Sequence, residues 1–144
     1  MKHTLLALSL LVPSAAHAVS FDSKNLKCLA ENIYHEARGE STEGMVAVGI
    51  VTINRVKHSK FKNSICKVVY EPKQFSWTRN SRVRNAAKNK QAWAESKRIA
   101  INISKNKYPR WAKKYSKSYF FHSGSSKTRW GKPLIARTGN HVFY

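Results

Sequence analysis

The stretch from residue 43 to residue 57 is apolar on almost every side, and it constrains the fold more than any other feature. It contains the run Met45-Val46-Ala47-Val48-Gly49-Ile50-Val51. A helix that is apolar all round has to be buried, so we expect it to be the central element of the structure. Gly44 and Gly49 would let a neighbouring helix approach it closely.

An amphipathic helix is predicted just before it, between Ser23 and Gly39. Ser23 can cap the start of this helix, Gly39 can end it, and Ser41 or Thr42 can begin the next one. The two helices are expected to form a tight hairpin. The apolar stripe of the first helix comprises Leu26, Leu29, Ala30, Ile33 and Ala37, which recur at helical spacing.

The remaining chain combines one more long helix with strands near its end. Residues 65–70 suggest a short strand or buried turn, and residues 90–106 a helix. Aromatic and β-branched residues predict strands at 119–122 and 141–144, joined by a connection, 123–139, rich in Gly and Ser. We therefore predict an α+β fold, with a helical hairpin and a further helix packed with a small antiparallel sheet.

The first residues have the pattern of an export signal. A basic start at residues 1–3 precedes a Leu-rich run at 4–12 and the small-residue site Ala16-His17-Ala18. This predicts a signal peptide, residues 1–18, and a single mature domain, 19–144, that is periplasmic or secreted. The alternative is a retained membrane-anchoring helix, but the run is short for a span. We expect a monomer without a membrane span once the leader is cleaved.

Cys28 and Cys66 are the two cysteines of the chain. An even pair in an exported protein favours a disulfide, and neither a C-x-x-C spacing nor a nearby group of histidines suggests a metal site. Closing a loop of this size stabilises a small domain by about 3 to 4 kcal/mol.

The chain is strongly basic, with 27 Lys and Arg against 7 Asp and Glu and a formal net charge of +20. Such a charge predicts a polyanionic partner: nucleic acid, an anionic lipid surface or a bacterial wall. Export favours the wall. Aromatic residues interleave with lysines in the Lys-rich region 79–117, which can describe a nucleic-acid surface, although solvated helix faces produce the same pattern more often.

Several enzyme classes are disfavoured by missing motifs. The chain has no G-x-S-x-G, H-E-x-x-H, G-x-x-x-x-G-K or G-x-G-x-x-G. These absences argue against serine esterases, zincins, P-loop enzymes and dinucleotide binders. The chain has 7 Asp and Glu residues in all, so few side chains could act as a catalytic acid or base.

Glu36 is the carboxylate best placed for catalysis. In a helical projection it falls at the border of the apolar stripe, about 20° from Leu29. Partial burial there would raise the pKa of its carboxyl toward the range of a general acid. The alternative is an ion pair with Arg38 or Arg55. Glu40, one turn further on, could be a second carboxylate, or it could accept hydrogen bonds from the free amides of the next helix.

Several motifs together resemble the SleB type of cell wall hydrolase, a family that includes spore-cortex-lytic enzymes. They are E-A-R-G-E at 36–40, N-R-V at 54–56, Q-F-S-W at 74–77 and G-N-H-V-F-Y at 139–144. The resemblance implies a lysozyme-like α+β domain that cuts peptidoglycan glycan strands without a metal or organic cofactor. It also implies Glu36 as the catalytic acid of a lytic transglycosylase. The Lys-rich region 79–117 departs from the family pattern.

Further residues are candidates for sugar contacts, because rings stack on pyranose faces while amides and imidazoles bind hydroxyl groups. For Trp77, packing in the core is an equally good interpretation. The candidates are Gln74, Trp77, His122, Trp130 and His141.

Two other functions remain open at this point. One is lysozyme-type hydrolysis by a muramidase, which would use Glu36 and Glu40 as a carboxylate pair. The other is a non-catalytic cationic protein that binds the wall or nucleic acid. A lytic transglycosylase needs only one carboxyl, which agrees with the scarcity of acids, and no specific nucleic-acid partner is expected.

Overall fold

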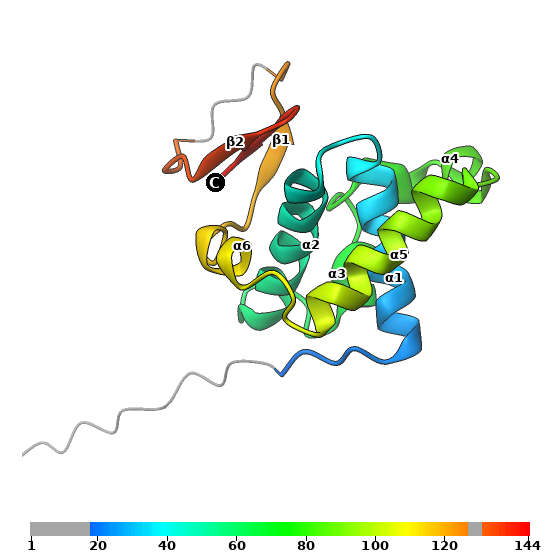
Figure 1. The fold of residues 1–144 in the computed structure, drawn as a ribbon, viewed down its shortest axis with the longest axis horizontal. Helices are drawn as coiled ribbons and strands as arrows, with labels where there is room; N and C mark the ends of the chain where they lie inside the picture. The colour runs from blue at the N-terminus through cyan, green and yellow to red at the C-terminus, as the bar shows by residue number, and fades with distance from the viewer. Residues whose placement is uncertain (1–17, 127–130) are drawn as a thin grey trace, which may run out of the picture.

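The computed structural model describes residues 18–126 and 131–144. The strands lie together at one end of the molecule, beside α2 and α6, while the other helices gather at the opposite end (Figure 1). The elements in chain order are α1 (Ser23–Ala37), α2 (Thr42–Lys57), α3 (Ile65–Val69), the 3-10 helix η1 (Ser76–Arg79), α4 (Ser81–Asn85), α5 (Lys90–Ser104), α6 (Pro109–Lys114), β1 (Phe121–Ser123), β2 (Ala136–Thr138) and β3 (His141–Phe143).

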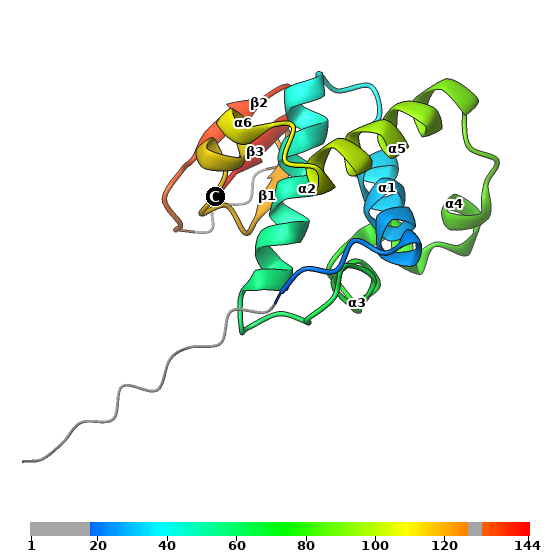
Figure 2. The same ribbon diagram turned by 60° about the horizontal axis from the view of Figure 1, so that its bottom comes forward.

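The apolar segment forms the central helix α2, as predicted. It lies between α1 and α5 on one side and α6 with the sheet on the other (Figure 2). Val46, Val48 and Val51 are fully buried within it. A Cβ atom at Gly49 would lie 2.5 Å from Cδ1 of Ile103 on α5, so the glycine permits the close helix approach expected from the sequence.

Helix α1 follows the prediction except at its first residue. The N-cap is Asp22, not Ser23, because the carboxylate of Asp22 accepts a hydrogen bond from the backbone N–H of Asn25 at 2.8 Å. Ser41 caps α2, accepting a bond from the N–H of Gly44 at 3.2 Å. Helix α1 packs against α2 and α5, which places its C-terminal turn beside the loop that leads into α2.

The segment predicted as a strand or buried turn is instead the short helix α3. Ile65, Val68 and Val69 are fully buried, and their spacing of three and four residues is that of one helical face. Ser64 caps the helix with its side chain. Cys66 of α3 forms a disulfide with Cys28 of α1, which confirms the predicted pair and ties α3 to the helix that carries Glu36.

The last third of the chain holds one more strand than predicted. Two of its strands match the predicted ones, and β2 arises within the connection that was expected to be a loop. The sheet is antiparallel in the order β1-β3-β2, with Phe121 and Ala136 both opposite Phe143. The long helix α5 agrees with prediction, whereas η1, α4 and α6 lack a strong periodic pattern and were not predicted.

Two predictions fall outside the described residues. Residues 1–17, which make up most of the predicted signal peptide, are one case, and Trp130 is the other. Both remain predictions. Within residues 18–126 and 131–144, no helix has the length and apolar character needed to cross a membrane.

Candidate active site

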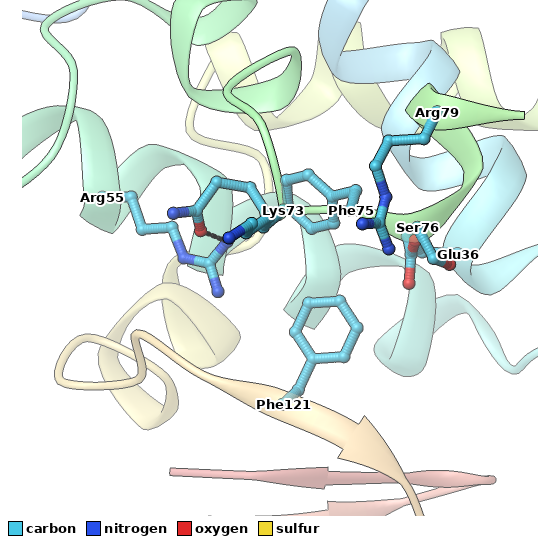
Figure 3. Close-up of a pocket in the computed structure, with 8 residues that line it drawn as sticks. Glu36, Arg55, Lys73, Phe75, Ser76, Arg79 and Phe121 are labelled. Atoms are coloured by element: carbon cyan, nitrogen blue, oxygen red, sulfur yellow. Dashed lines mark hydrogen bonds between the residues drawn. The ribbon is translucent and has the colours of Figure 1, made fainter.

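Glu36 lines a cavity of about 270 Å³ that is built from segments far apart in the sequence. Helix α1 contributes Glu36, α2 contributes Arg55, the chain between α3 and η1 contributes several side chains, and β1 contributes Phe121 (Figure 3). The cavity therefore forms only when the helices and the sheet are packed together. Its lining residues are Glu36, Arg55, Lys73, Gln74, Phe75, Ser76, Arg79 and Phe121.

The carboxyl of Glu36 is half-buried and has no hydrogen-bond or ion-pair partner among the described residues. Burial raises its pKa to about 7, and the positive charge of Arg55 opposes this increase. The predicted partial burial is thereby confirmed. A carboxyl with this pKa carries a proton in a large share of molecules at neutral pH, which is the condition for a general acid.

The alternative ion pair between Glu36 and an arginine is absent from the described residues. Arg38 instead lies over the ring of Tyr34, 4.9 Å from its centroid, and donates a hydrogen bond to the backbone carbonyl of Tyr34. No cation of the described residues lies within ion-pair distance of Glu36. The carboxyl is thus available to a ligand in the cavity.

Arg55 is a fixed positive charge in the cavity wall, with only 5% of its surface exposed. Its Nε donates to the backbone carbonyl of Tyr119 at 2.8 Å, and its Nη1 donates to Oε1 of Gln74 at 3.1 Å (Figure 3). Burial lowers the pKa of Arg55 to about 10 and Glu36 opposes this, so the guanidinium stays charged at neutral pH. Gln74, a predicted site residue, is held in the cavity by this bond.

The aromatic part of the cavity consists of Phe75 and Phe121, whose ring centroids are 6.3 Å apart. Phe75 is buried and Phe121 is half-buried, so part of the second ring is open to a ligand. Apolar ring faces are suited to stacking on the C–H faces of a pyranose. The cavity therefore contains a carboxyl with a raised pKa, a cation and aromatic surface.

Glu40 does not line this cavity, and both of its carboxylate oxygens have partners. Oε2 accepts a bond from the backbone N–H of Asn140 at 3.1 Å, and Oε1 accepts one from Nδ2 of Asn140 at 2.9 Å. Of the two roles that the sequence left open for Glu40, the capping of the next helix is taken by Ser41. Glu40 instead fastens the turn between β2 and β3 to the end of α1.

Trp77 lies in the core. Only 5% of its surface is exposed, its indole N–H donates to Oδ1 of Asn32 at 3.1 Å, and its ring stacks on His35 with centroids 4.2 Å apart. Of the two interpretations offered by the sequence, these contacts support packing. The ring of Trp77 is not part of the cavity wall that contains Glu36.

The two predicted histidines occupy opposite faces of the sheet. Side chains alternate along a strand, so His122 points away from the face on which Phe121 meets the cavity. Its Nε2 lies 3.2 Å from the hydroxyl of Tyr144. His141 shares the face of Phe121 and packs edge-on against that ring at 5.3 Å. Burial lowers the pKa of His141, with Glu40 opposing, and its ring supports the Phe121 wall.

A family profile, several curated proteins and two solved structures match this chain. The Cell Wall Hydrolase family profile matches residues 39–144. The chain belongs to this family. The matched segment begins at residue 39, so it does not include Glu36.

Curated relatives of this chain are named as spore cortex-lytic enzymes or as a cell wall hydrolase. The spore cortex-lytic enzyme of Bacillus subtilis is 30% identical over 125 residues, covering 85% of this chain and 38% of the relative. The cell wall hydrolase CwlJ of the same organism is 32% identical over 127 residues, covering 85% of each protein. The chain thus spans less than half the length of the cortex-lytic enzyme.

Two solved structures share the fold of this cell wall hydrolase. The catalytic domain of the Bacillus cereus SleB protein has a TM-score of 0.69 and 24% identity, covering 86% of this chain and 91% of that one. The catalytic domain of the germination-specific lytic transglycosylase SleB of Bacillus anthracis has a TM-score of 0.68 and 23% identity, covering 85% and 95%. The predicted α+β, lysozyme-like fold class is confirmed.

Sequence reasoning overlooked several residues around Glu36 in this cell wall hydrolase. Lys73 and Arg79 line the cavity but belong to no quoted motif, and Ser76 lies within Q-F-S-W but was not singled out as a site residue. Their nearness to the Q-F-S-W segment was a usable signal, since Gln74 was already a candidate. Arg55 was expected as part of the N-R-V motif and as an alternative ion-pair partner of Glu36, because the sequence does not show that its side chain is buried in the cavity wall.

Proposed function

We propose that this cell wall hydrolase cuts the glycan strand of peptidoglycan between N-acetylmuramic acid and N-acetylglucosamine. In this proposal it acts as a lytic transglycosylase with Glu36 as the single catalytic carboxyl. One observation carries the proposal: a half-buried carboxyl, without an ion-pair partner among residues 18–126 and 131–144 and with a pKa raised to about 7, lines a cavity that also contains a cation and aromatic rings. Family membership and the names of the relatives support the same substrate class.

The proposed reaction has two proton transfers at one residue. Glu36 first donates its proton to the glycosidic oxygen, the C1–O bond breaks, and positive charge develops at C1 of the muramyl residue. The Glu36 carboxylate then removes the proton of the muramyl C6 hydroxyl, whose oxygen bonds to C1. The product is a 1,6-anhydro sugar, and Glu36 regains its proton, so no second acid is consumed.

Arg55 is suited to assist the first transfer. When Glu36 gives up its proton it becomes an anion in a partly desolvated site, and a nearby guanidinium stabilises that anion without moving. Its bonds to Tyr119 and Gln74 hold it in place. Phe121 offers a ring face for the sugar beside the bond that breaks.

Hydrolysis by a carboxylate pair is the less well supported mechanism. It requires a second carboxylate on the far side of the sugar, at a distance that leaves room for attack. Glu40 is the only acid of the sequence that follows Glu36 by one helical turn, and its oxygens are bound to Asn140 outside the cavity. The arrangement favours the one-carboxyl mechanism.

Mass spectrometry of the fragments released from purified glycan strands tests this proposal. We expect products lighter by one water than hydrolysed fragments, and their loss in Glu36→Gln at unchanged folding. Ordinary reducing ends would contradict the transglycosylase mechanism and point to Glu40. Retained activity in Glu36→Gln would remove Glu36 from the mechanism. Salt-sensitive binding of nucleic acid without any release of wall fragments would favour the cationic binding protein instead.

The place of action in the cell is part of the proposal. We propose cleavage after Ala18 and export of residues 19–144 to the periplasm or medium, where the wall is accessible. N-terminal sequencing of the protein recovered outside the cytoplasm tests this. A first residue of Val19 is expected, and an intact Met1 would contradict it.

A further inference from the structure

A second cavity, of about 510 Å³, adjoins the one that contains Glu36. Ser76 and Arg79 line both cavities. The two cavities therefore meet at these side chains, and the second one, which we call the outer groove, lies beside η1 and the start of α4. In Figure 3, Arg79 extends from η1 on the same side of the cavity as Glu36. The outer groove is lined by Ser76, Arg79, Asn80, Ser81 and Arg82.

The outer groove is cationic and holds no acid. Residues 72–94 contain no Asp or Glu. The ion pairs among the described residues use Lys62, Arg98 and Lys114, so the exposed side chains of Arg79 and Arg82 have no carboxylate partner there. The cations of this stretch are Lys73, Arg79, Arg82, Arg84, Lys88 and Lys90.

The backbone that carries these arginines is fixed by local contacts. Nη1 of Arg84 donates to the carbonyl of Thr78 at 2.9 Å, which ties α4 to η1. Oδ1 of Asn80 accepts a bond from the N–H of Val83 at 3.2 Å. The positions from which Arg79 and Arg82 project are therefore set relative to the cavity of Glu36.

We propose that Arg79 and Arg82 form a subsite for the carboxylates of the peptide side chains carried by the glycan strand. The inference rests on the proposed function. It adds that the outer groove binds the peptide part of the substrate. The sugars of such a strand offer hydroxyl and amide groups, whereas its peptides carry carboxylates. A guanidinium matches a carboxylate with two parallel hydrogen bonds, which a lysine does not.

The position of the subsite favours a peptide of the bound strand over a separate polyanion. The outer groove shares Ser76 and Arg79 with the cavity at Glu36, so a substituent on a sugar near the cleaved bond can reach it. The two arginines also lie at the start of the Lys-rich region 79–117.

The test compares two substrates, peptide-bearing glycan strands and the same strands treated with an amidase, which removes the peptides with their carboxylates and leaves one lactyl carboxylate on each muramic acid. We expect Arg82→Gln to lower the ratio of kcat/KM for peptide-bearing over peptide-free strands about threefold, and the Arg79→Gln, Arg82→Gln double variant about tenfold. Arg110→Gln removes the same charge from α6, on the other side of the molecule from α4 (Figure 1). It should leave the ratio unchanged.

Binding to Glu36→Gln protein separates this inference from the proposed function. Uncleaved peptide-bearing strands should bind more tightly than peptide-free strands, and Arg82→Gln should remove the difference. If the wild type cuts neither substrate, the proposed function fails. The difference in binding between the two kinds of strand still tests whether the subsite exists. An unchanged ratio, an equal effect of Arg110→Gln, or stronger competition by a phosphate polymer than by free wall peptide would overturn the subsite.

Discussion

At the scale of single residues, Glu36 depends on two opposing influences. Burial on the wall of the cavity raises the pKa of its carboxyl, and Arg55 limits the increase. The result is an acid that is protonated in a useful fraction of molecules near neutral pH and can lose its proton during the reaction. A fully buried position would keep the proton, and an exposed one would lose it too readily.

The pH dependence of activity follows from this pKa. In the proposed mechanism Glu36 begins the reaction protonated, so we expect kcat/KM to fall as pH rises through about 7. Above that pH the fall should approach tenfold per pH unit. The measurement is a pH profile of kcat/KM on purified glycan strands at constant ionic strength. A profile that is flat from pH 5 to pH 9 would exclude Glu36 as the initial acid.

The same group makes stability depend on pH. The pKa of Glu36 is about 7 in the folded protein against an ordinary 4.5. Between these values the folded state binds more protons, so its contribution to stability is lost as pH rises through the window, by about 3 kcal/mol in full. Glu36→Gln should therefore be more stable than wild type at pH 8 and nearly equal to it at pH 4. Urea unfolding at both pH values measures this, and equal unfolding midpoints at pH 8 would contradict it.

At the scale of elements, the turn between β2 and β3 is held by α1. Gly139 has a φ of +55°, and a Cβ atom there would lie on Oε2 of Glu40. The glycine is thus needed for its conformation and for the space that Glu40 occupies. Glu40 in turn binds Asn140. Through these contacts the loop that follows α1 positions the sheet face that carries Phe121 and His141.

Replacing Gly139 tests this coupling. Gly139→Ala should destabilise the protein by about 1 to 3 kcal/mol, because it adds backbone strain and displaces Glu40. Gly131→Ala is a matched control, since Gly131 has a φ of +62° but nothing within 4 Å of its added Cβ. Its cost should be limited to the strain. Thermal unfolding measures both, and equal losses would show that Glu40 does not matter to the turn.

At the scale of the whole molecule, the site exists only where three parts of the chain meet. Helix α1 supplies the acid, α2 the cation, and β1 an aromatic wall. The disulfide between Cys28 and Cys66 fastens α1 to α3, directly before the segment that leads to Gln74 and η1. It therefore stabilises the arrangement of the cavity as well as the fold.

Removing the disulfide tests its contribution. The Cys28→Ser, Cys66→Ser double variant should lose about 4 kcal/mol of unfolding free energy, because the unfolded chain regains the freedom of a long loop. Urea unfolding with and without a reductant measures the loss. Since the chain contains 2 cysteines, the reductant should not change the double variant further. An unfolding midpoint equal to that of the oxidised wild type would contradict the prediction.

Much of the helical architecture could be read from local patterns. The spacing of Leu29 and Ile33 predicted α1, and the continuous apolar run predicted a central α2, because these periodicities depend on near neighbours. The short elements were harder. Ile65, Val68 and Val69 carried a helical spacing over too few residues to outweigh their β-branched character, and β2 has only three residues.

The sequence by itself determined the two packed helices, the disulfide pair and a carboxyl at the edge of the apolar stripe, since each follows from residue type and local spacing. The tertiary structure decided what surrounds that carboxyl. It brought Arg55 and Phe121 to the cavity, took Glu40 to the β2–β3 turn and placed Trp77 in the core. These outcomes depend on contacts between residues distant in the chain, where burial and charge are set by neighbours that local spacing does not specify.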